Sequence, residues 1–315
     1  MNFNRAQIQY LLAIDRFRSI MKASEHCHIS QPSLSMQLKN IEESLGLILF
    51  DRTKQPLKVT EAGQRILDQA KQVLSEMEKI ESIAQEEKGK IEGSLSIGII
   101  PTLAPYLLPL FAGEFIIKYP DVEIRIHEDF TENICQQISL GNLDVGILVT
   151  PVRVEGIEER PIFYEEFYAY AGKDIHEKHP SNTISLQSLL INHIWLLEEG
   201  NCFRNQTFNL CGSNMIKEKY NNLKYQSGSL QTLINMVDVQ GGFTLIPQLA
   251  SNYLSENQAE RLKFIDDKKA VREVSVIHPK RFAKTNLIEK LIKEIEIGVP
   301  DELMANKAQN LIEIY

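Results

Sequence analysis

Two cysteines nine residues apart are the side chains in this sequence best suited to chemistry. Cys202 lies where an apolar, strand-like stretch passes into a helix-like one, and Arg204 follows two residues later. The N-terminus of a helix and a guanidinium group each favour the thiolate, which is the reactive form of a cysteine. Cys211 lies at the far end of the same segment. The spacing indicates a redox-active pair, with two unrelated core cysteines as the alternative.

A disulfide bond between these two cysteines would have to change the backbone. If the segment between them is helical, a rise of about 1.5 Å per residue separates their Cα atoms by roughly 13 Å. A disulfide bond needs Cα atoms within about 7 Å of each other. Bond formation would therefore unwind or rearrange the segment, and a chemical event would become a conformational one.

The remaining motifs give no support for an enzyme. Cys27 lies between His26 and His28, but adjacent residues of a helix point apart and no fourth metal ligand is close in sequence. Cys135 fits an amphipathic core segment. The sequence contains no HExxH, P-loop, GxGxxG or CxxC pattern. We therefore expect no catalytic residue, no cofactor and no metal.

The composition is that of a globular protein large enough for two domains. The chain has 315 residues, of which 43% are hydrophobic and 24% charged, which argues against disordered, collagen-like and disulfide-scaffold classes. Its apolar runs are far shorter than the roughly 20 residues of a membrane-spanning helix, and its N-terminus has no apolar signal core. Four cysteines are too few for a secreted disulfide framework. We expect a cytoplasmic protein with no membrane partner.

Charge is unevenly distributed along the chain. Residues 1–60 hold eight Lys and Arg against five Asp and Glu, a net charge of +3, so the remainder carries −11 of the total of −8. A basic module on an acidic body favours nucleic-acid binding at the N-terminus. Protein surfaces that bind no nucleic acid can carry a similar net charge, so the hypothesis of nucleic-acid binding also needs support from the pattern of helices and strands.

Helical patterns in this basic region predict a DNA-reading unit. Apolar spacing predicts helices over 6–17 and 20–27, and Ser30 is an N-cap for a third helix with Pro32 in its first turn. Polar residues near the N-terminus of such a helix can reach base edges in the major groove. The third helix should bury Leu34, Leu38 and Ile41, and expose Gln31, Ser33, Ser35, Met36 and Lys39. Residues 47–50 and 57–60 predict two short strands around a polar loop, the wing of a winged helix.

This region resembles the DNA-binding domain of the LysR-type transcriptional regulators. The matching runs are SQPSLS from residue 30, IEESLG from residue 41, LFDR from residue 49 and TEAG from residue 60. The resemblance implies a winged helix-turn-helix over 1–60, a double-stranded DNA operator and RNA polymerase as partners. It implies major-groove contacts by Gln31, Pro32, Ser33, Ser35 and Met36, and contacts to the backbone or minor groove by Arg52 and Lys54. Many members have Arg where this chain has Met36, so a guanine-reading contact is absent there.

Residues 61–90 predict a long linker helix that dimerises. Apolar residues recur in alternating steps of four and three, which is a heptad seam. The seam consists of Ile66, Ala70, Val73, Met77, Ile80 and Ala84. It could instead pack on its own chain, but a two-fold dimer would present two reading helices to a pseudo-palindromic operator. We expect a homodimer or homotetramer, and an end to the helix at a Gly-containing break over 88–93.

The rest of the chain alternates strand-like and helix-like patterns, which predicts an α/β architecture with mainly parallel sheets. Strands are expected at 95–100, 122–127, 143–149, 194–197, 243–246 and 271–277, and helices at 103–118, 133–140, 186–190, 229–239 and 286–297. The family resemblance implies that 91–297 form a regulatory domain of two Rossmann-like subdomains of the periplasmic-binding-protein type, with an effector cleft between them. Residues 298–315 are expected to form a helical tail that packs on a partner subunit.

Two threonines are expected at helix N-termini that face this cleft. Thr102 follows the strand over 95–100, and Thr131 follows the strand over 122–127. Helix N-termini and hydroxyl groups bind anions and small polar ligands. Plain helix capping is the alternative for each threonine.

Residues 198–212 also resemble the peroxide-sensing OxyR branch of the same family. That branch has a reactive Cys, an Arg two residues later and a resolving Cys nine residues on, as in Cys202, Arg204 and Cys211. The resemblance implies that hydrogen peroxide oxidises Cys202 to a sulfenic acid, that Cys211 condenses with it, and that the oxidised protein activates antioxidant genes. It assigns the positioning of peroxide to Thr102, Thr131, Arg204 and Arg272.

Two departures from that branch leave other functions open. Asn201 stands where a His is common, and Asn205 stands where an acid is common, so the reactivity towards peroxide is expected to differ. The alternative is a LysR-type regulator that responds to a small metabolite in the cleft. A thiol peroxidase is a third hypothesis, but it gives no use to the DNA-reading helix or the linker.

Overall fold

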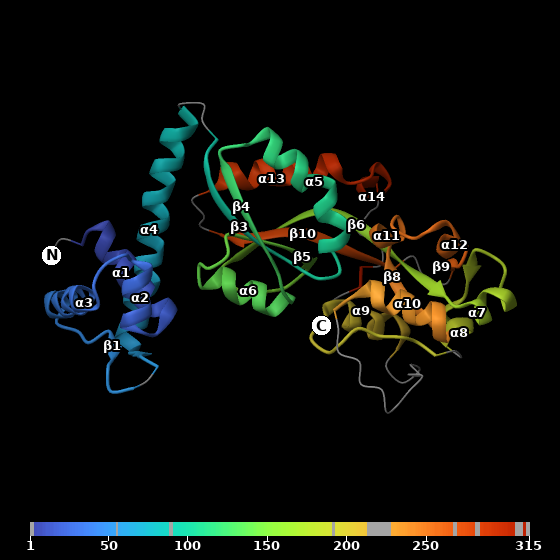
Figure 1. Ribbon diagram of the computed structural model, residues 1–315, viewed down its shortest axis with the longest axis horizontal. Coiled ribbons are helices and arrows are strands. Elements are labelled where there is room, and N and C mark those ends of the chain that lie inside the picture. The colour runs from blue at the N-terminus through green and yellow to red at the C-terminus, as the bar shows by residue number, and fades with distance from the viewer. Residues whose placement is uncertain are drawn as a thin grey trace. The chain divides into compact units, whose positions relative to one another are not determined.

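The computed structural model describes residues 3–54, 56–87, 91–190, 193–212, 228–266, 270–280, 284–305 and 311–312. Contacts divide the chain into two compact units. Unit 1 comprises Met1–Lys90 with Arg281–Asn286, and unit 2 comprises Ile91–Lys280 with Leu287–Tyr315 (Figure 1). Within the described residues, no helix is both long and apolar enough to cross a membrane.

Unit 1 is a winged helix-turn-helix followed by a long helix. Its elements are α1 (Arg5–Phe17), α2 (Ile20–His26), α3 (Gln31–Leu45), β1 (Phe50–Asp51), β2 (Lys58–Val59) and α4 (Glu61–Glu87). The Ser30 hydroxyl caps α3 by accepting a hydrogen bond from the Ser33 N–H at 3.3 Å. The apolar face of α3 is buried as expected. The wing strands are shorter than expected: two residues each, with Ile48 exposed ahead of them.

The seam on α4 divides into a buried and an exposed part. Ala70 is buried in unit 1, next to Leu67, which has no exposed surface. Val73 and Ile80 are 38% and 69% exposed. The first turns of α4 therefore belong to the core of their own unit, and the later apolar positions face outward. Of the expected break over 88–93, residues 88–90 lie outside the described part of the chain.

Unit 2 is an α/β unit built on one mixed sheet in the order β4-β3-β5-β10-β6-β9-β7, with β8 also paired to β6. The strands are β3 (Gly93–Ile99), β4 (Val122–Glu128), β5 (Val145–Thr150), β6 (Ile157–Ala171), β7 (Thr183–Ile184), β8 (Phe243–Pro247), β9 (Leu262–Ile265) and β10 (Val271–Pro279). The helices are α5 (Ala104–Lys118), α6 (Thr131–Ser139), α7 (Lys173–Lys178), α8 (Leu186–Leu190), α9 (Cys202–Cys211), α10 (Leu230–Gln240), α11 (Gln248–Ser251), α12 (Glu256–Ala259), α13 (Thr285–Gly298) and α14 (Asp301–Ala305).

The expectation of a mainly parallel sheet is wrong. β3 is parallel to β4 and β5, but β10 is antiparallel to both β5 and β6, and β6 is antiparallel to β8 and β9. The sequence pattern does not reveal β6, because its glutamates and Pro161 interrupt the apolar alternation. The strand expected at 194–197 is reduced to a single bridge between Ile194 and Phe243.

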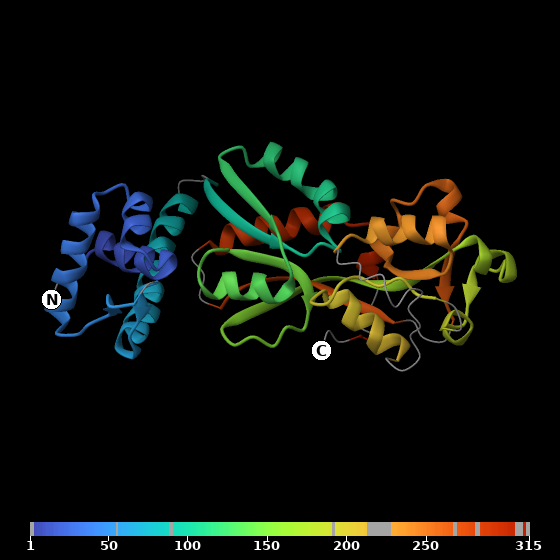
Figure 2. The ribbon, with the colours of Figure 1, turned by 60° about the horizontal axis from the view of Figure 1, so that its bottom comes forward.

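The long strands β6 and β10 link two Rossmann-like halves of unit 2. The first half holds β4, β3 and β5, with α5 and α13 on one face and α6 on the other (Figures 1 and 2). The second half holds β8 and β9, which pair with the C-terminal part of β6, and β7, which pairs with β9. Side chains at the end of β5, on β6 and at the start of β10 therefore lie where the two halves meet.

Two glycines allow α6 to lie close to the sheet. A Cβ atom at Gly98 would come within 3.0 Å of the Ile134 side chain, and one at Gly146 within 2.8 Å. Ile134 lies one turn into α6 and is fully buried. Because of this close approach, the first residue of α6, Thr131, is held near the strand ends.

The described part of the C-terminal tail packs on its own chain. Leu303 of α14 is 1% exposed. The Ile312 N–H donates to the Val271 carbonyl at 2.9 Å, and Leu311 bridges to Val271 in parallel. The tail is helical only in part, since Leu311 and Ile312 pair with β10. The rest of the expected tail helix, residues 306–310 and 313–315, lies outside the described residues.

Candidate functional site

Four predicted site residues converge where the two halves of unit 2 meet. Thr102 lies between β3 and α5, Thr131 begins α6, Cys202 begins α9 and Arg272 lies near the start of β10. All four are buried, with exposed fractions of 1%, 6%, 7% and 0%. Side chains far apart in sequence therefore form one buried polar group around a thiol.

Arg272 has the most contacts in this group. Its Nη1 donates to Thr102 Oγ1 at 3.1 Å, and its Nη2 donates to the Thr102 carbonyl at 3.4 Å. Its Nε donates to Glu165 Oε1 at 2.8 Å. The guanidinium carbon lies 5.1 Å from the centre of the Phe203 ring, which immediately follows Cys202. The cation therefore lies fully buried beside the first turn of α9.

The surroundings of Cys202 have opposing effects on the pKa of its thiol. Burial raises the pKa of Cys202 above its ordinary value, and the Arg272 charge opposes that rise by favouring the thiolate. Thr131 also acts to lower the pKa. Among the described residues, the buried Thr131 hydroxyl has no hydrogen-bond partner of standard geometry. It thus remains able to bind a small polar molecule or the reacting sulfur.

Arg204 does not join this group, although it is close to Cys202 in sequence. Its Nη1 donates to the Leu197 carbonyl at 2.8 Å, and its guanidinium lies 5.0 Å from the centre of the Phe208 ring. Residues two apart on a helix point in different directions. The charge that acts on the Cys202 thiol is that of Arg272.

Cys211 is at the opposite end of α9 and is also reduced and buried. Burial raises its pKa to about 12. As expected, the segment between the cysteines is helical, so the two thiols cannot bond without rearrangement of α9. Asn201 is the N-cap of α9, and its Oδ1 accepts from the Phe203 N–H at 3.0 Å.

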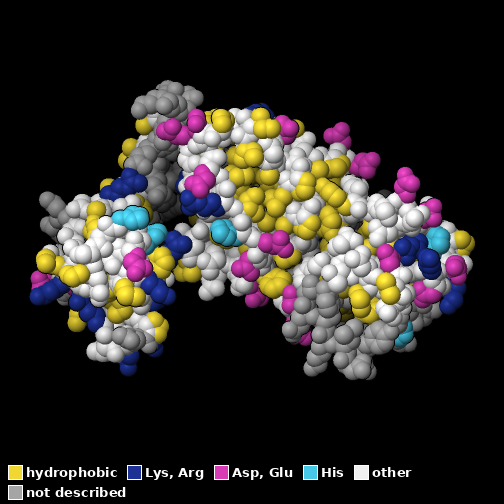
Figure 3. Space-filling view, in the orientation of Figure 1, with side chains coloured by type: hydrophobic (Ala, Val, Ile, Leu, Met, Phe, Trp, Pro, Cys, Tyr) yellow, Lys and Arg dark blue, Asp and Glu magenta, His cyan; other side chains and the backbone are white. Residues whose placement is uncertain are grey.

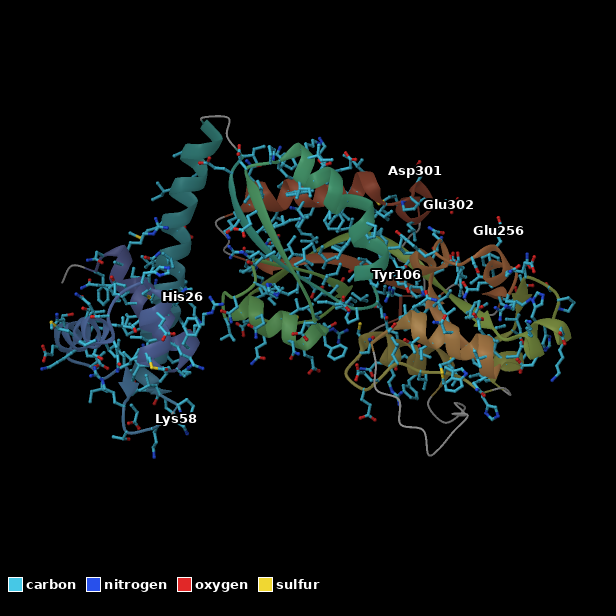
Figure 4. All side chains as sticks on the ribbon, in the orientation of Figure 1. His26, Lys58, Tyr106, Glu256, Asp301 and Glu302 are labelled. Carbon is cyan, nitrogen blue, oxygen red and sulfur yellow. The ribbon has the colours of Figure 1, made fainter. Side chains whose placement is uncertain are left out.

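The structure places two further residues at the site that the sequence does not point to. Glu165 has no exposed surface, and it holds Arg272 from the neighbouring strand. Tyr106, labelled in Figure 4, lies close enough to Arg272 for the cation to oppose the rise of its pKa, which burial takes to about 12. The signal that could have identified Glu165 is the register of β6 against β10, which pairs it with Arg272. The sequence pattern does not supply this register, because it does not reveal β6.

Neither threonine acts as a plain helix cap. The N-cap residues are Leu103 for α5 and Phe130 for α6, and neither makes a side-chain capping bond. The Thr102 hydroxyl accepts from Arg272 instead. The described residues include no group of three or more His, Cys, Asp or Glu placed to hold a metal ion.

In unit 1, α3 presents the expected polar face. Gln31, Pro32 and Ser33 are exposed, Ser35 is partly exposed, and Met36 is 62% exposed. The Ser33 hydroxyl also forms a hydrogen bond with the hydroxyl of the N-cap residue Ser30, at 2.7 Å between the two oxygens. Figure 4 shows Lys58 and His26 in the same unit, outside the α3 face.

The two basic residues of the wing differ in their surroundings. Arg52 Nη2 donates to Glu42 Oε2 at 2.7 Å, and Glu42 Oε1 accepts from the N–H groups of Leu49 and Phe50. Glu42 thus ties Arg52 and the first wing strand to α3. Lys54 is exposed at the tip of the wing.

A winged helix-turn-helix joined to an α/β unit of two halves places the protein in the class of bacterial transcription regulators that bind DNA. The chain belongs to the LysR family. Residues 6–64 match the bacterial regulatory helix-turn-helix proteins of the lysR family, and residues 88–297 match the LysR substrate binding domain.

Within this family, the chain is similar to proteins of the OxyR kind. The hydrogen peroxide-inducible genes activator of Haemophilus influenzae is 33% identical over 265 residues, which cover 83% of this chain and 85% of the relative. A full-length OxyR variant from Pseudomonas aeruginosa has a TM-score of 0.78 and 26% identity over 97% of this chain and 100% of that one. A hydrogen peroxide-bound OxyR mutant from Corynebacterium glutamicum has a TM-score of 0.59 and 28% identity, and covers 98% of each chain.

Proposed function

We propose that the protein is a sequence-specific, DNA-binding transcriptional regulator that senses hydrogen peroxide through reversible formation of a Cys202–Cys211 disulfide bond and controls antioxidant genes. The observation that carries this proposal is the burial of Cys202 beside the Arg272 cation and the Thr131 hydroxyl. The similarity to peroxide-inducible activators supports it.

The chemistry requires two thiols, one peroxide molecule and no cofactor. The Cys202 thiolate attacks one peroxide oxygen, the O–O bond breaks, and the departing hydroxide takes a proton to leave as water, so that a sulfenic acid remains. The Cys211 sulfur then gives up its proton and attacks the Cys202 sulfur, and the S–O bond breaks to release a second water. The two thiols lose two electrons, which peroxide accepts. A dithiol reductant returns two electrons and two protons to reset the pair.

Each surrounding residue has a role in this proposal. Arg272 stabilises the thiolate and is held against Thr102. The hydroxyls of Thr102 and Thr131 position peroxide; in the described part of the chain, Thr131 Oγ1 has no standard hydrogen-bond partner that would compete. Arg204 acts at a distance from the sulfur, by anchoring α9 to the Leu197 carbonyl.

For DNA binding, the proposal assigns base contacts to the exposed N-terminal face of α3, with Gln31, Pro32, Ser33, Ser35 and Met36. Lys54 contacts the DNA backbone, and Arg52 contributes chiefly by holding the wing against Glu42. Reorganisation of α9 on oxidation would be transmitted to the bound dimer and to RNA polymerase.

Self-association accounts for apolar surfaces that the described residues leave uncovered. On α4, Ile80 and Ile83 are 69% and 57% exposed. On α5, Ile116 and Ile117 are 50% and 75% exposed. Figure 3 shows that hydrophobic side chains gather on this face of unit 2. A homodimer or homotetramer would bury such surfaces.

The test is to treat the reduced protein with near-stoichiometric hydrogen peroxide, block the free thiols and map disulfides by tryptic mass spectrometry. Trypsin cuts after Arg204, so a Cys202–Cys211 bond appears as two cross-linked peptides that separate on reduction. Cys202→Ser should abolish the peroxide response and keep the DNA binding of the reduced protein. A response that persists in Cys202→Ser would overturn the proposal.

A second function is favoured by one observation. Burial raises the pKa of Cys202, which disfavours the reactive thiolate at neutral pH. A LysR-type regulator that binds a small polar metabolite at Thr102 and Thr131 would not need that thiolate. This alternative predicts a ligand-induced rise in the unfolding temperature that is the same in Cys202→Ser.

A further inference from the structure

Glu165 and Arg272 form a cross-strand pair at the centre of unit 2. They lie directly opposite each other on β6 and β10, and neither side chain has exposed surface. Glu165 Oε1 accepts from Arg272 Nε at 2.8 Å and lies 2.7 Å from Nη2. Glu165 Oε2 accepts from the Leu249 N–H at 2.9 Å. Both carboxylate oxygens are therefore occupied, so the carboxylate has a single position.

This pair decides where the rest of the guanidinium points. Because Glu165 holds the Nε edge, Nη1 is directed to the Thr102 hydroxyl at 3.1 Å. The guanidinium carbon lies 5.1 Å from the centre of the Phe203 ring. A freely rotating arginine could satisfy the same number of hydrogen bonds in several orientations, and most of them would move the cation away from Cys202.

The pair also decides how much positive charge the thiol experiences. A buried arginine without a partner is strongly unfavourable, and a carboxylate that touches it shares its charge. The Cys202 thiol is thus next to a cation that is already partly neutralised. The charge that favours the thiolate is reduced, while the burial that opposes it remains.

We infer that Glu165 is a positioning residue of the peroxide site, which fixes the direction of the Arg272 guanidinium towards Thr102 and Cys202 and limits how strongly its charge stabilises the thiolate. The inference rests on the proposed function in one respect, namely that the molecule that reacts with Cys202 is peroxide. Its electrostatic part concerns the Cys202 thiol alone and can be tested without peroxide.

The experiment compares two substitutions that separate charge from geometry. Glu165→Gln removes the charge and keeps the length of the side chain. Glu165→Asp keeps the charge, but its shorter side chain cannot reach both Arg272 and the Leu249 N–H. Glu273→Gln is the matched control, because Glu273 is the next residue on β10 and binds Thr150 and Tyr164 instead.

Two quantities are measured on each full-length variant. The first is the pH midpoint of the Cys202 thiolate, from the ultraviolet absorbance difference between the variant and the same variant with Cys202→Ser. The second is the rate constant of peroxide consumption per thiolate. Glu165→Gln should lower the midpoint by about one pH unit, a tenfold gain in thiolate at neutral pH. Glu165→Asp should leave the midpoint near that of the native protein and reduce the rate per thiolate about tenfold.

The outcomes separate this inference from the proposed function. If Glu165→Gln leaves the midpoint unchanged or raises it, or if Glu165→Asp reacts like the native protein, the positioning role is wrong. Should Glu165→Gln fail to fold, the rate with Glu165→Asp still decides the geometric part. If the native protein does not react with peroxide while the midpoints shift as expected, the proposed function fails and the electrostatic role of Glu165 stands.

Discussion

Gln206 Nε2 donates a hydrogen bond to the Ile312 carbonyl at 2.9 Å, which joins the middle of α9 to the C-terminal segment. Gln206 has no exposed surface and lies between the two cysteines. Ile312 is held on its other side by the Val271 carbonyl, next to Arg272. The segment that must reorganise for a disulfide bond therefore also holds the tail in place.

From this relationship we expect oxidation to loosen the tail. A Cys202–Cys211 bond requires α9 to unwind, and Gln206 would leave the Ile312 carbonyl. Hydrogen exchange of the Ile312 amide should be at least about tenfold faster in the oxidised protein than in the reduced one. The Cys202→Ser variant treated with peroxide is the control and should keep the slow rate. Equal exchange in both redox states would mean that the tail does not depend on α9.

The Thr131 hydroxyl should matter for reactivity more than for stability. Thr131→Val removes a side chain that, together with Arg272, lowers the pKa of Cys202. We expect the rate of oxidation by peroxide to fall about tenfold at neutral pH, because the pKa of Cys202 rises and less of the thiol is ionised. Stopped-flow measurement of thiol loss gives the rate. Unfolding by urea serves as the control, since Thr131 makes no standard hydrogen bond that the valine would lose.

Oxidation of Cys202 should accelerate with pH over a wide range. Only the thiolate reacts, and burial raises the pKa of the thiol, so the thiolate fraction at neutral pH is small. Each pH unit below that pKa should increase the rate about tenfold. The pH dependence of sulfenic acid formation, followed with a trapping reagent, measures this slope. A rate independent of pH between 6 and about 8 would indicate a thiol that is already ionised.

The helices of the DNA-binding unit could be predicted from the sequence, but the group of side chains around Cys202 in unit 2 could be predicted only in part. Ser30 and the spacing of Leu34, Leu38 and Ile41 suffice for α3, because capping and helical periodicity are local. Arg204 is the opposite case: it is close to Cys202 in sequence, but its guanidinium donates to the Leu197 carbonyl, and the charge that acts on the thiol is that of Arg272. Glu165 depends on the register of β6 against β10, which local patterns do not contain.

The stability of the reduced protein should decrease at high pH because of Cys211. Its folded-state pKa is about 12, whereas an unfolded cysteine has a pKa near 8.5. Below about pH 8.5 the Cys211 thiol keeps its proton in both the folded and the unfolded state, so it does not make the free energy of unfolding depend on pH. Between about 8.5 and 12 the unfolded chain releases a proton that the folded chain retains, so the free energy of unfolding falls by about 1.4 kcal/mol per pH unit. Urea unfolding in the presence of reductant measures this, and Cys211→Ala should show a smaller slope by that amount.

The DNA-binding unit offers a test that separates base reading from backbone contact. Gln31 is exposed at the N-terminus of α3, and Lys54 is exposed on the wing. Gln31→Ala should cost about 1–3 kcal/mol on the preferred operator and little on unrelated DNA. Lys54→Ala should weaken binding to both DNAs alike and reduce the salt dependence of log affinity by about one. Titrations at several salt concentrations with reduced protein measure both effects. If Gln31→Ala weakens binding to all sequences equally, α3 does not read bases through this residue.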